Sequence, residues 1–188
     1  MDQNSRTFAL AMLFESSLGF VGLGIAWLAG ISLADRLQIA IVGVERGLIA
    51  TLPMLVMLGV LTQSKSPPLV EIRRHIEQLV SELFARSNWL EIALISLAAG
   101  VGEELLFRGA MQPWIASWTN PLLALSVVSL LFGLAHAMTT SYFVLATLIG
   151  GYLGWLAMEY DDLVAPIVAH TLYDFVALLY VVRRVRRQ

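Results

Sequence analysis

The sequence predicts an all-α fold, a polytopic membrane bundle of about six transmembrane helices with one amphipathic helix in the membrane interface. Hydrophobic residues make up 58% of the 188 residues and charged residues only 14%, whereas soluble domains carry about a quarter charged residues. The mean hydropathy is +0.76. The apolar residues fall into runs long enough to cross the hydrocarbon core of a bilayer. We therefore expect one integral-membrane domain over residues 1–188.

The first part of the chain predicts two spans. The first lies within Phe8–Ala34, a run that is too long for one upright helix, with Glu15 near one of its edges. The second covers roughly Gly47–Thr62, with Leu37–Val44 available to extend it. The polar break Ser64–Pro68 then marks the start of another helix, because proline is favoured in a first helical turn.

Residues 70–86 predict the amphipathic helix. Apolar side chains recur there at helical spacing, and charged or amide side chains fill the opposite face, which is the pattern of a helix in the membrane interface. The apolar positions are Ile72, Ile76, Leu79, Val80 and Leu83. This helix is interpreted as a connector that packs on the bundle, with a partner-binding surface as the alternative.

The remaining half, residues 89–182, predicts four further spans and carries most of the buried ionisable groups. Gly150, Gly151 and Gly154 permit close contact between helices there. The four spans are about Trp89–Phe107, Pro121–Ala137, Ser141–Met158 and Leu163–Val182.

Lysine and arginine placement predicts the orientation, because cytoplasmic loops are enriched in these residues. With six spans, both termini share one side with nine of the twelve basic residues, so we expect both termini in the cytoplasm and the protein in a prokaryotic plasma membrane. The nine are Arg6, Lys65, Arg73, Arg74, Arg86, Arg183, Arg184, Arg186 and Arg187. The N-terminal residues 2–6 predict no cleaved signal peptide. Cysteine is absent, which excludes disulfides and thiolate chemistry.

Two adjacent glutamates stand out in the third expected span. Ionisable groups at membrane depth cost roughly 2.5–3.5 kcal/mol each, so a chain that keeps several uses them together. Glu104 and Arg108 are four residues apart and can form an ion pair. Glu103 points about 100° away on an ideal helix and has no local cation. Taken alone, this segment is also explained by a structural salt-bridge cluster.

Two histidines follow at the centres of later apolar helices. His136 comes one turn after Phe132, so the two rings stack along one face. His170 and Asp174 are again four residues apart, and the carboxylate can hold the imidazole in one tautomer. Each histidine alone also fits a purely structural hydrogen bond.

The combination favours chemistry, because three helices each place a buried acid or imidazole at membrane depth. A carboxylate and two histidines can position and deprotonate a water, or they can bind a metal with an open position. The sequence has no His-Glu-x-x-His helix, no Gly-x-Ser-x-Gly elbow and no phosphate-binding glycine loop. No basic, aromatic-rich surface indicates a nucleic-acid partner.

The ordered motifs Glu-Glu-x-x-x-Arg, Phe-x-x-x-His and His-x-x-x-Asp resemble those of the CAAX prenyl endopeptidase and bacteriocin-processing (CPBP or Abi) family of intramembrane proteases. The resemblance implies an intramembrane glutamic-type endopeptidase. By motif position, Glu103 is implied as the general base with His136 holding the water, and His170 with Asp174 as the oxyanion site. Glu104, Arg108 and Phe132 are implied as supports. No metal or other cofactor is favoured, with zinc as the alternative.

Asp174 departs from the asparagine that resembling prenyl endopeptidases carry at this position. An ionised carboxylate repels a developing oxyanion, and an oxyanion donor is typically worth about 2.7–4 kcal/mol. Asp174 is therefore either protonated in its apolar site or serves to orient His170, which then donates alone.

The expected reaction is hydrolysis of a peptide bond in a membrane-embedded or lipid-anchored peptide or protein, with the lipid bilayer as the other partner. The expected alternative is a non-catalytic membrane scaffold or bacteriocin-immunity-type protein of the same fold. A proton-coupled transporter is a third reading, which the short spans without internal repeats disfavour. The sequence does not predict the oligomeric state.

Overall fold

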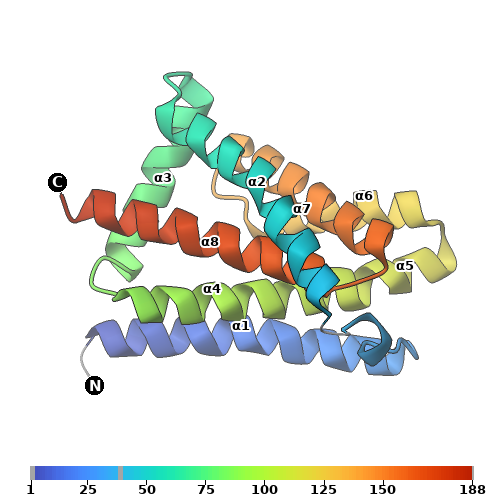
Figure 1. The fold of residues 1–188 in the computed structure, drawn as a ribbon. Helices are drawn as coiled ribbons and strands as arrows, with labels where there is room; N and C mark the ends of the chain where they lie inside the picture. Colours follow the sequence, from blue (N-terminus) through green and yellow to red (C-terminus); the bar gives the residue numbers. More distant parts are fainter. Residues whose placement is uncertain (1–2, 38–39, 188) are drawn as a thin grey trace.

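Helices form every regular element in residues 3–37 and 40–187, the part of the chain that the computed structural model describes. This confirms the all-α prediction (Figure 1). The elements are α1 (Gln3–Leu28), η1 (Ala34–Arg36), α2 (Ile41–Gln63), α3 (Pro67–Leu83), α4 (Trp89–Glu104), η2 (Leu105–Met111), α5 (Gln112–Trp118), α6 (Pro121–Ala135), α7 (Thr140–Tyr160) and α8 (Val164–Val185).

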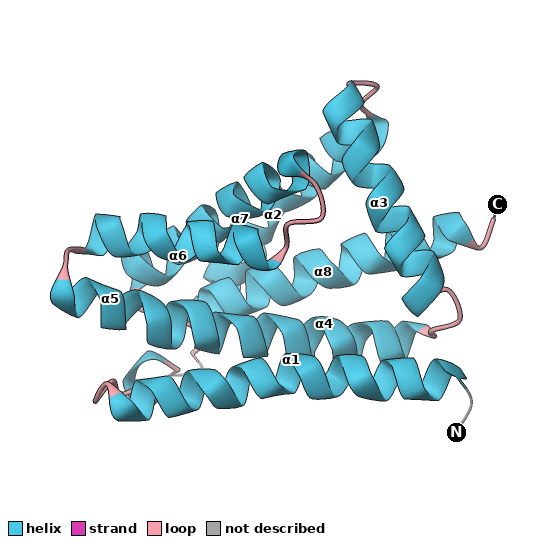
Figure 2. Cartoon of the chain, turned by 180° about the vertical axis from the view of Figure 1, so that it is seen from behind, coloured by secondary structure: helices cyan, strands magenta, loops and turns pink. Residues whose placement is uncertain are grey.

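Four of these helices, α1, α2, α7 and α8, are long and apolar enough to cross a membrane. Two further expected spans are shorter or interrupted. Helix α6 has 15 residues, and α4 has 16 but continues through η2 into α5 as one rod (Figure 2). Residues 38–39, in the stretch expected to extend the second span, lie outside the described part, as do residues 1–2.

The η2 segment is π-helical, a local widening that the sequence analysis did not foresee. Such single-turn widenings are rare inside α-helices and occur often at functional sites. Here the segment starts directly after Glu104 and contains Arg108. The third expected span, Trp89–Phe107, therefore runs into a π-helical turn and does not end as a regular α-helix.

Helix α4 occupies the middle of the bundle, between α1 on one side and α8 on the other (Figures 1 and 2). Helices α6 and α7 pack as an antiparallel pair, and α2 lies along α8. Because α4 is covered on two sides, its last turn is buried, from Gly102 to Glu104.

Small residues set the distance between α1 and the central rod. A Cβ added at Gly22 would lie 2.7 Å from the backbone nitrogen of Leu106, and one at Gly102 would meet the backbone oxygen of Glu15. Real side chains do not tolerate such approaches, so both positions require glycine at this spacing. Gly24, two residues further along α1, has open space around it.

Replacing Gly22 by alanine is expected to destabilise the protein by about 1–3 kcal/mol, because the new methyl group overpacks the contact with Leu106. The matched variant Gly24→Ala should keep or slightly raise the stability, since alanine is the better helix former. Unfolding in detergent micelles, followed by circular dichroism, measures both. Equal stability of the two variants would contradict this account of the α1 contact.

Helix α3 crosses one end of the bundle and packs against α8, α2 and α7, burying Ile72 and Val80. It begins at Pro67, three residues before the expected start. The Arg73 guanidinium donates to the carbonyl oxygens of Leu61, Thr62 and Ser64 at the end of α2. Glu77 and Arg184 join α3 to α8 at 2.7 Å. This packing agrees with the interpretation of α3 as a connector.

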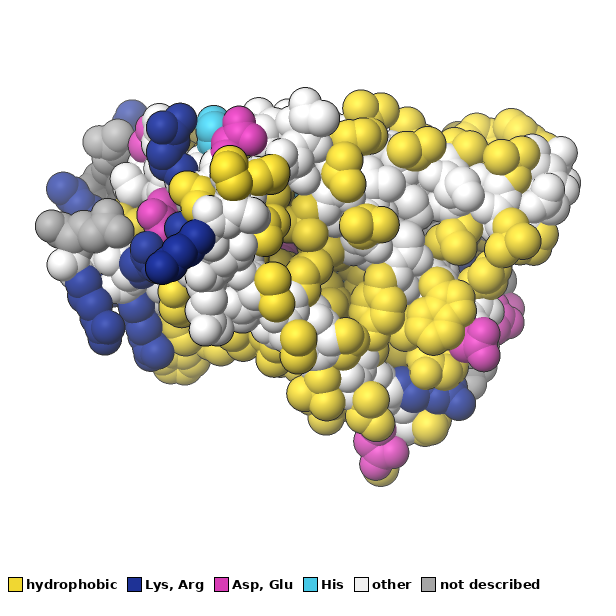
Figure 3. Space-filling view, turned by 90° about the horizontal axis from the view of Figure 1, so that it is seen from above, with side chains coloured by type: hydrophobic (Ala, Val, Ile, Leu, Met, Phe, Trp, Pro, Cys, Tyr) yellow, Lys and Arg dark blue, Asp and Glu magenta, His cyan; other side chains and the backbone are white. Residues whose placement is uncertain are grey.

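Both termini lie at this same end of the bundle (Figure 1). Seen from above, lysine and arginine side chains gather there, while hydrophobic side chains cover much of the remaining face (Figure 3). The exposed large hydrophobics include Phe14, Phe20, Trp27 and Trp89, which suits contact with lipid.

Candidate active site

Glu103 lies on the last turn of α4, with 6% of its surface exposed. One of its carboxylate oxygens, Oε2, is 3.6 Å from Nε2 of His136. This separation exceeds that of a direct hydrogen bond, and Oε2 has no hydrogen-bond partner among the described residues. The sequence predicted no cation near Glu103 on its own helix. In the structure the group beside its carboxylate is the His136 imidazole, at the end of α6.

His136 is not at the centre of a helix, as the sequence analysis expected, but at the C-terminal cap of α6. Its Nδ1 lies 2.9 Å from the backbone oxygen of Phe132. Because a carbonyl only accepts, Nδ1 carries the proton and donates it, which turns Nε2 toward Glu103. The imidazole stacks on the Phe132 ring at 4.5 Å between centroids, as their spacing predicts.

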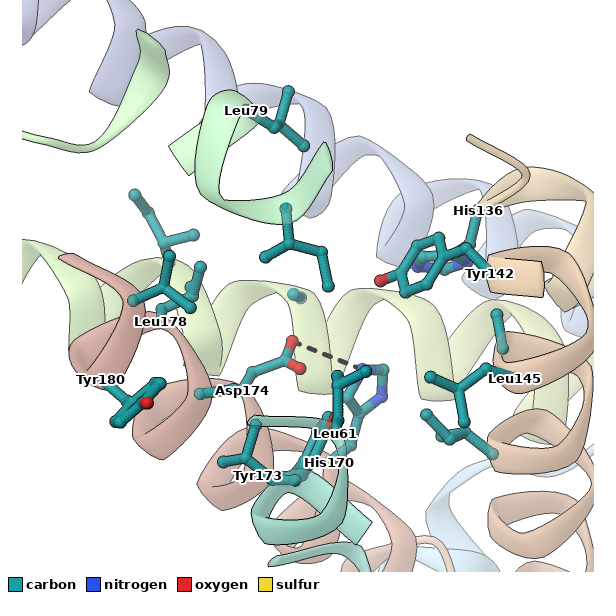
Figure 4. Close-up of a pocket in the computed structure, with 18 of the residues that line it drawn as sticks. Leu61, Leu79, His136, Tyr142, Leu145, His170, Tyr173, Asp174, Leu178 and Tyr180 are labelled. Atoms are coloured by element: carbon teal, nitrogen blue, oxygen red, sulfur yellow. Dashed lines mark ion pairs between the residues drawn. The ribbon is translucent and has the colours of Figure 1, made fainter. Parts of the chain in front are cut away.

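His170 lies in the second turn of α8, near its start and not at its centre, and is buried between two carboxylates. Its Nδ1 lies 2.9 Å from Oε1 of Glu104, and its Nε2 lies 3.5 Å from Oδ2 of Asp174 (Figure 4). The spacing of His170 and Asp174 predicts Asp174 alone as the partner that holds this ring. The closer partner is Glu104, which comes from α4 and is 66 residues away in the chain.

Glu104 and Arg108 form the expected ion pair at 2.9 Å, and both side chains are fully buried. The guanidinium also donates to the backbone oxygen of Gly150 on α7 at 2.8 Å and lies 4.4 Å from the centre of the Phe132 ring. Glu104 therefore carries two partners on one oxygen, Arg108 and His170. These additional hydrogen bonds offset part of the cost of burying the charged pair, while Oε2 of Glu104 and Nε of Arg108 have no hydrogen-bond partner among the described residues.

The Phe132 ring contacts most of the side chains that form the site. It contacts His136 on one side and the Arg108 guanidinium on another, and it meets the rings of Phe107 and His170 edge-on. A Cβ at Gly150 would lie 3.1 Å from this ring, so the glycine there lets the phenyl group reach the site.

All four expected catalytic residues, together with Phe132, line one cavity of about 290 Å³. Figure 4 shows His136 and Tyr142 on one side of it and His170 with Asp174 on another. Away from these polar groups the cavity extends toward α3, where Arg73 and Glu77 line it together with apolar side chains, among them Leu61, Ile76, Leu79 and Leu178. Three distant motifs thus converge on one space inside the bundle.

Two further residues at the cavity were not foreseen as part of the site. Glu15 lies midway along α1 and lines the cavity, although the sequence analysis put it near the edge of a span. The sequence feature that could have identified Glu15 is its charge within a long apolar run. Tyr142, near the start of α7, also lines the cavity, and nothing in its sequence context distinguished it.

Among residues 3–37 and 40–187, no three histidine, aspartate or glutamate side chains are grouped so as to hold a metal ion.

Comparison with known proteins agrees with the motifs. Residues 85–176 match a sequence model of the family described as type II CAAX prenyl endopeptidase Rce1-like. The uncharacterized protein YpbD of Bacillus subtilis (strain 168) is 30% identical over 98 residues, which are 50% of this chain and 48% of YpbD. The chain thus spans about half the length of this curated relative. No solved structure gives a significant match.

The matched region contains the glutamate pair, Arg108 and both site histidines with Asp174, whereas α1, α2 and α3 lie before it. The long apolar helices and the matched family together make this an integral membrane protein. The resemblance seen in the motifs is confirmed over residues 85–176, which match the type II CAAX prenyl endopeptidase Rce1-like family.

Proposed function

We propose that this protein is an intramembrane endopeptidase that hydrolyses a peptide bond in a membrane-anchored or lipid-modified peptide or protein. The observation that carries the proposal is the meeting of Glu103 and His136, 3.6 Å apart, in a buried cavity that His170 and Asp174 also line. The family match supports the reaction class. The many apolar side chains that line the cavity support a substrate that enters from lipid.

In the proposed reaction, Glu103 is the general base. A water that contacts Glu103 and Nε2 of His136 attacks the carbonyl carbon of the scissile peptide bond and gives its proton to Glu103. The protonated Glu103 then transfers that proton to the leaving nitrogen as the carbon–nitrogen bond breaks. No metal takes part in this proposal.

We assign the oxyanion to His170. Its Nδ1 donates to Oε1 of Glu104, which also accepts from Arg108 at 2.9 Å. When Nε2 is also protonated, it can donate to the oxyanion. Asp174 Oδ2 lies 3.5 Å from the same nitrogen, beyond a direct hydrogen bond, and leaves that proton free for the oxyanion.

We further propose that the basic end of the bundle faces the cytoplasm of a prokaryotic cell, in the plasma membrane. The termini, the α3 helix and the four C-terminal arginines share that end. Since the cavity extends toward α3, the substrate approaches from the cytoplasmic half of the membrane.

The proposal is tested with purified protein in liposomes and two internally quenched peptide reporters, one ending in a prenylated CAAX sequence and one carrying a transmembrane anchor. Wild-type protein should cleave at least one reporter at a single bond, identified by mass spectrometry. His170→Ala should lower kcat about 10²–10³-fold, as loss of an oxyanion donor does. His136→Ala should lower it about 10²-fold or more.

The third histidine provides the control. His75 lies on α3, bonds to the Glu71 carbonyl at 2.9 Å and does not line the cavity. His75→Ala should therefore cleave at the wild-type rate. Undiminished cleavage by both His136→Ala and His170→Ala would overturn the proposed mechanism.

A further inference from the structure

Glu15 carries a buried acceptor that the hydrolytic mechanism leaves unused. Its Oε2 is shielded from solvent and has no hydrogen-bond partner among the described residues. An unpaired buried acceptor costs about 1–3 kcal/mol, and a charged one costs more. Glu15 also lies midway along a membrane helix, where an acidic group is already unfavourable. Such a residue is explained when a partner reaches it from the cavity.

The position of Glu15 relative to the site is fixed by close backbone packing. Gly102, next to Glu103, has no Cβ, so the backbone oxygen of Glu15 approaches it directly. The Glu15 side chain lines the same cavity as Glu103, His136 and His170. Glu15 lies outside the family match, which begins at residue 85.

Glu15 and His170 reach the cavity from opposite sides of the helix that carries Glu103. Helix α1 packs on one side of α4, and α8 packs on the other (Figure 1). In a trans peptide bond the carbonyl and the N–H point in opposite directions. A scissile bond whose oxygen is held by His170 on the α8 side therefore directs its own N–H toward the α1 side.

We propose that Glu15 is a substrate-binding residue that accepts a hydrogen bond from the backbone N–H of the scissile peptide bond. This inference rests on the proposed endopeptidase function and adds the group that holds the other end of the amide. With the oxygen held by His170 and the N–H by Glu15, the carbonyl carbon faces the water at Glu103. The contact favours secondary amides and disfavours bonds that lack the N–H, such as those before proline.

The test compares the cleaved reporter with an analogue in which an ester replaces the scissile amide and so removes the N–H. Affinities are measured for proteins that carry Glu103→Gln, so that the ester survives. With Glu15 intact, the ester should bind about tenfold more weakly, as loss of a hydrogen bond to a charged group predicts. With Glu15→Leu, amide and ester should bind equally. Glu15→Gln, which keeps an acceptor oxygen, should give an intermediate difference.

Ser17 provides the matched control. It lies on α1 two residues from Glu15 with its side chain exposed and bonded to the Phe14 carbonyl. Ser17→Leu should keep the full tenfold preference for the amide. Thermal unfolding of each variant in detergent checks that the fold is intact, and the near-isosteric Glu15→Gln keeps the test decisive if Glu15→Leu unfolds.

The outcomes separate the two proposals. Cleavage that depends on Glu103, combined with the same amide preference in Glu15→Leu and Glu15→Gln as with Glu15 intact, contradicts the role of Glu15 alone. A wild-type protein that cleaves neither reporter contradicts the endopeptidase function, and the assignment of Glu15 falls with it.

Discussion

Replacing Glu103 by glutamine should lower the rate of reporter cleavage about 10³-fold, within the range of 10²–10⁴ for loss of a general base. Glutamine has nearly the same size and keeps an oxygen that can accept a hydrogen bond from water. It cannot take up the proton of that water, so the attacking oxygen remains neutral and weakly nucleophilic. Burial of the side chain, which is 6% exposed, leaves no bulk water to replace it as a base.

The measurement is the single-turnover rate in liposomes, where cleavage is separated from product release. Glu159→Gln is the control, because this exposed glutamate at the end of α7 undergoes the same chemical change away from the cavity. It should cleave as wild type does. If Glu103→Gln retains full cleavage, another group activates the water. If the protein acts in cells and this action survives Glu103→Gln, the non-catalytic scaffold or immunity role explains it better.

Replacing Arg108 by methionine should destabilise the protein by about 3–5 kcal/mol, the range for breaking a buried ion pair by removal of one partner. The substitution leaves the Glu104 carboxylate buried without its cation. It also frees the backbone oxygen of Gly150, which loses its donor at 2.8 Å. Since Glu104 holds His170, cleavage should fall together with stability.

A second pair of the same kind shows what burial contributes. Arg184 and Glu77 are 2.7 Å apart, but the arginine side chain is 39% exposed. Arg184→Met should therefore cost no more than about 1 kcal/mol. Urea or dodecyl sulfate unfolding in mixed micelles measures both variants. A similar, small loss in the two proteins would show that the buried pair does not support the fold.

The double variant Glu104→Gln/Arg108→Met tests the reason for the loss. It removes both charges, so most of the stability should return, because no uncompensated charge remains. Cleavage should stay low, since glutamine holds the His170 imidazole less firmly than a carboxylate does.

Much of the fold follows from the sequence because apolar runs and polar breaks are local features. The polar break at Ser66 and Pro67 predicted a helix start, and α3 begins there. The apolar run from Leu163 predicted a span, and α8 occupies it. The π-helical turn was not predictable from pattern alone, because residues 105–111 are as apolar as a regular helix. The end of α6 before His136 was also missed, since the run continues to Ala137 and its glycine, Gly133, lies inside the helix.

For the site, the spacing of four residues predicted contacts within a helix but not between helices. The Glu104–Arg108 pair and the Phe132–His136 stack are of the first kind. The bond from His170 to Glu104 and the approach of Glu15 are of the second kind, and they depend on how α1, α4 and α8 pack. The Asp174 motif suggested one partner for His170, while the structure supplies two.

The π-helical turn determines in which direction the side chains of α5 point relative to those of α4. It holds one residue more than a regular helix of the same rise, and one residue corresponds to a rotation of about 100°. Upstream of it, Glu103 and Glu104 face the cavity and α8. Downstream, Gln112 donates to the Gly154 carbonyl on α7 at 3.0 Å. A homologue shorter by one residue between Leu105 and Met111 could keep every apolar side chain and still turn Gln112 away from α7. Insertions and deletions here therefore carry more information about the architecture of a relative than substitutions do.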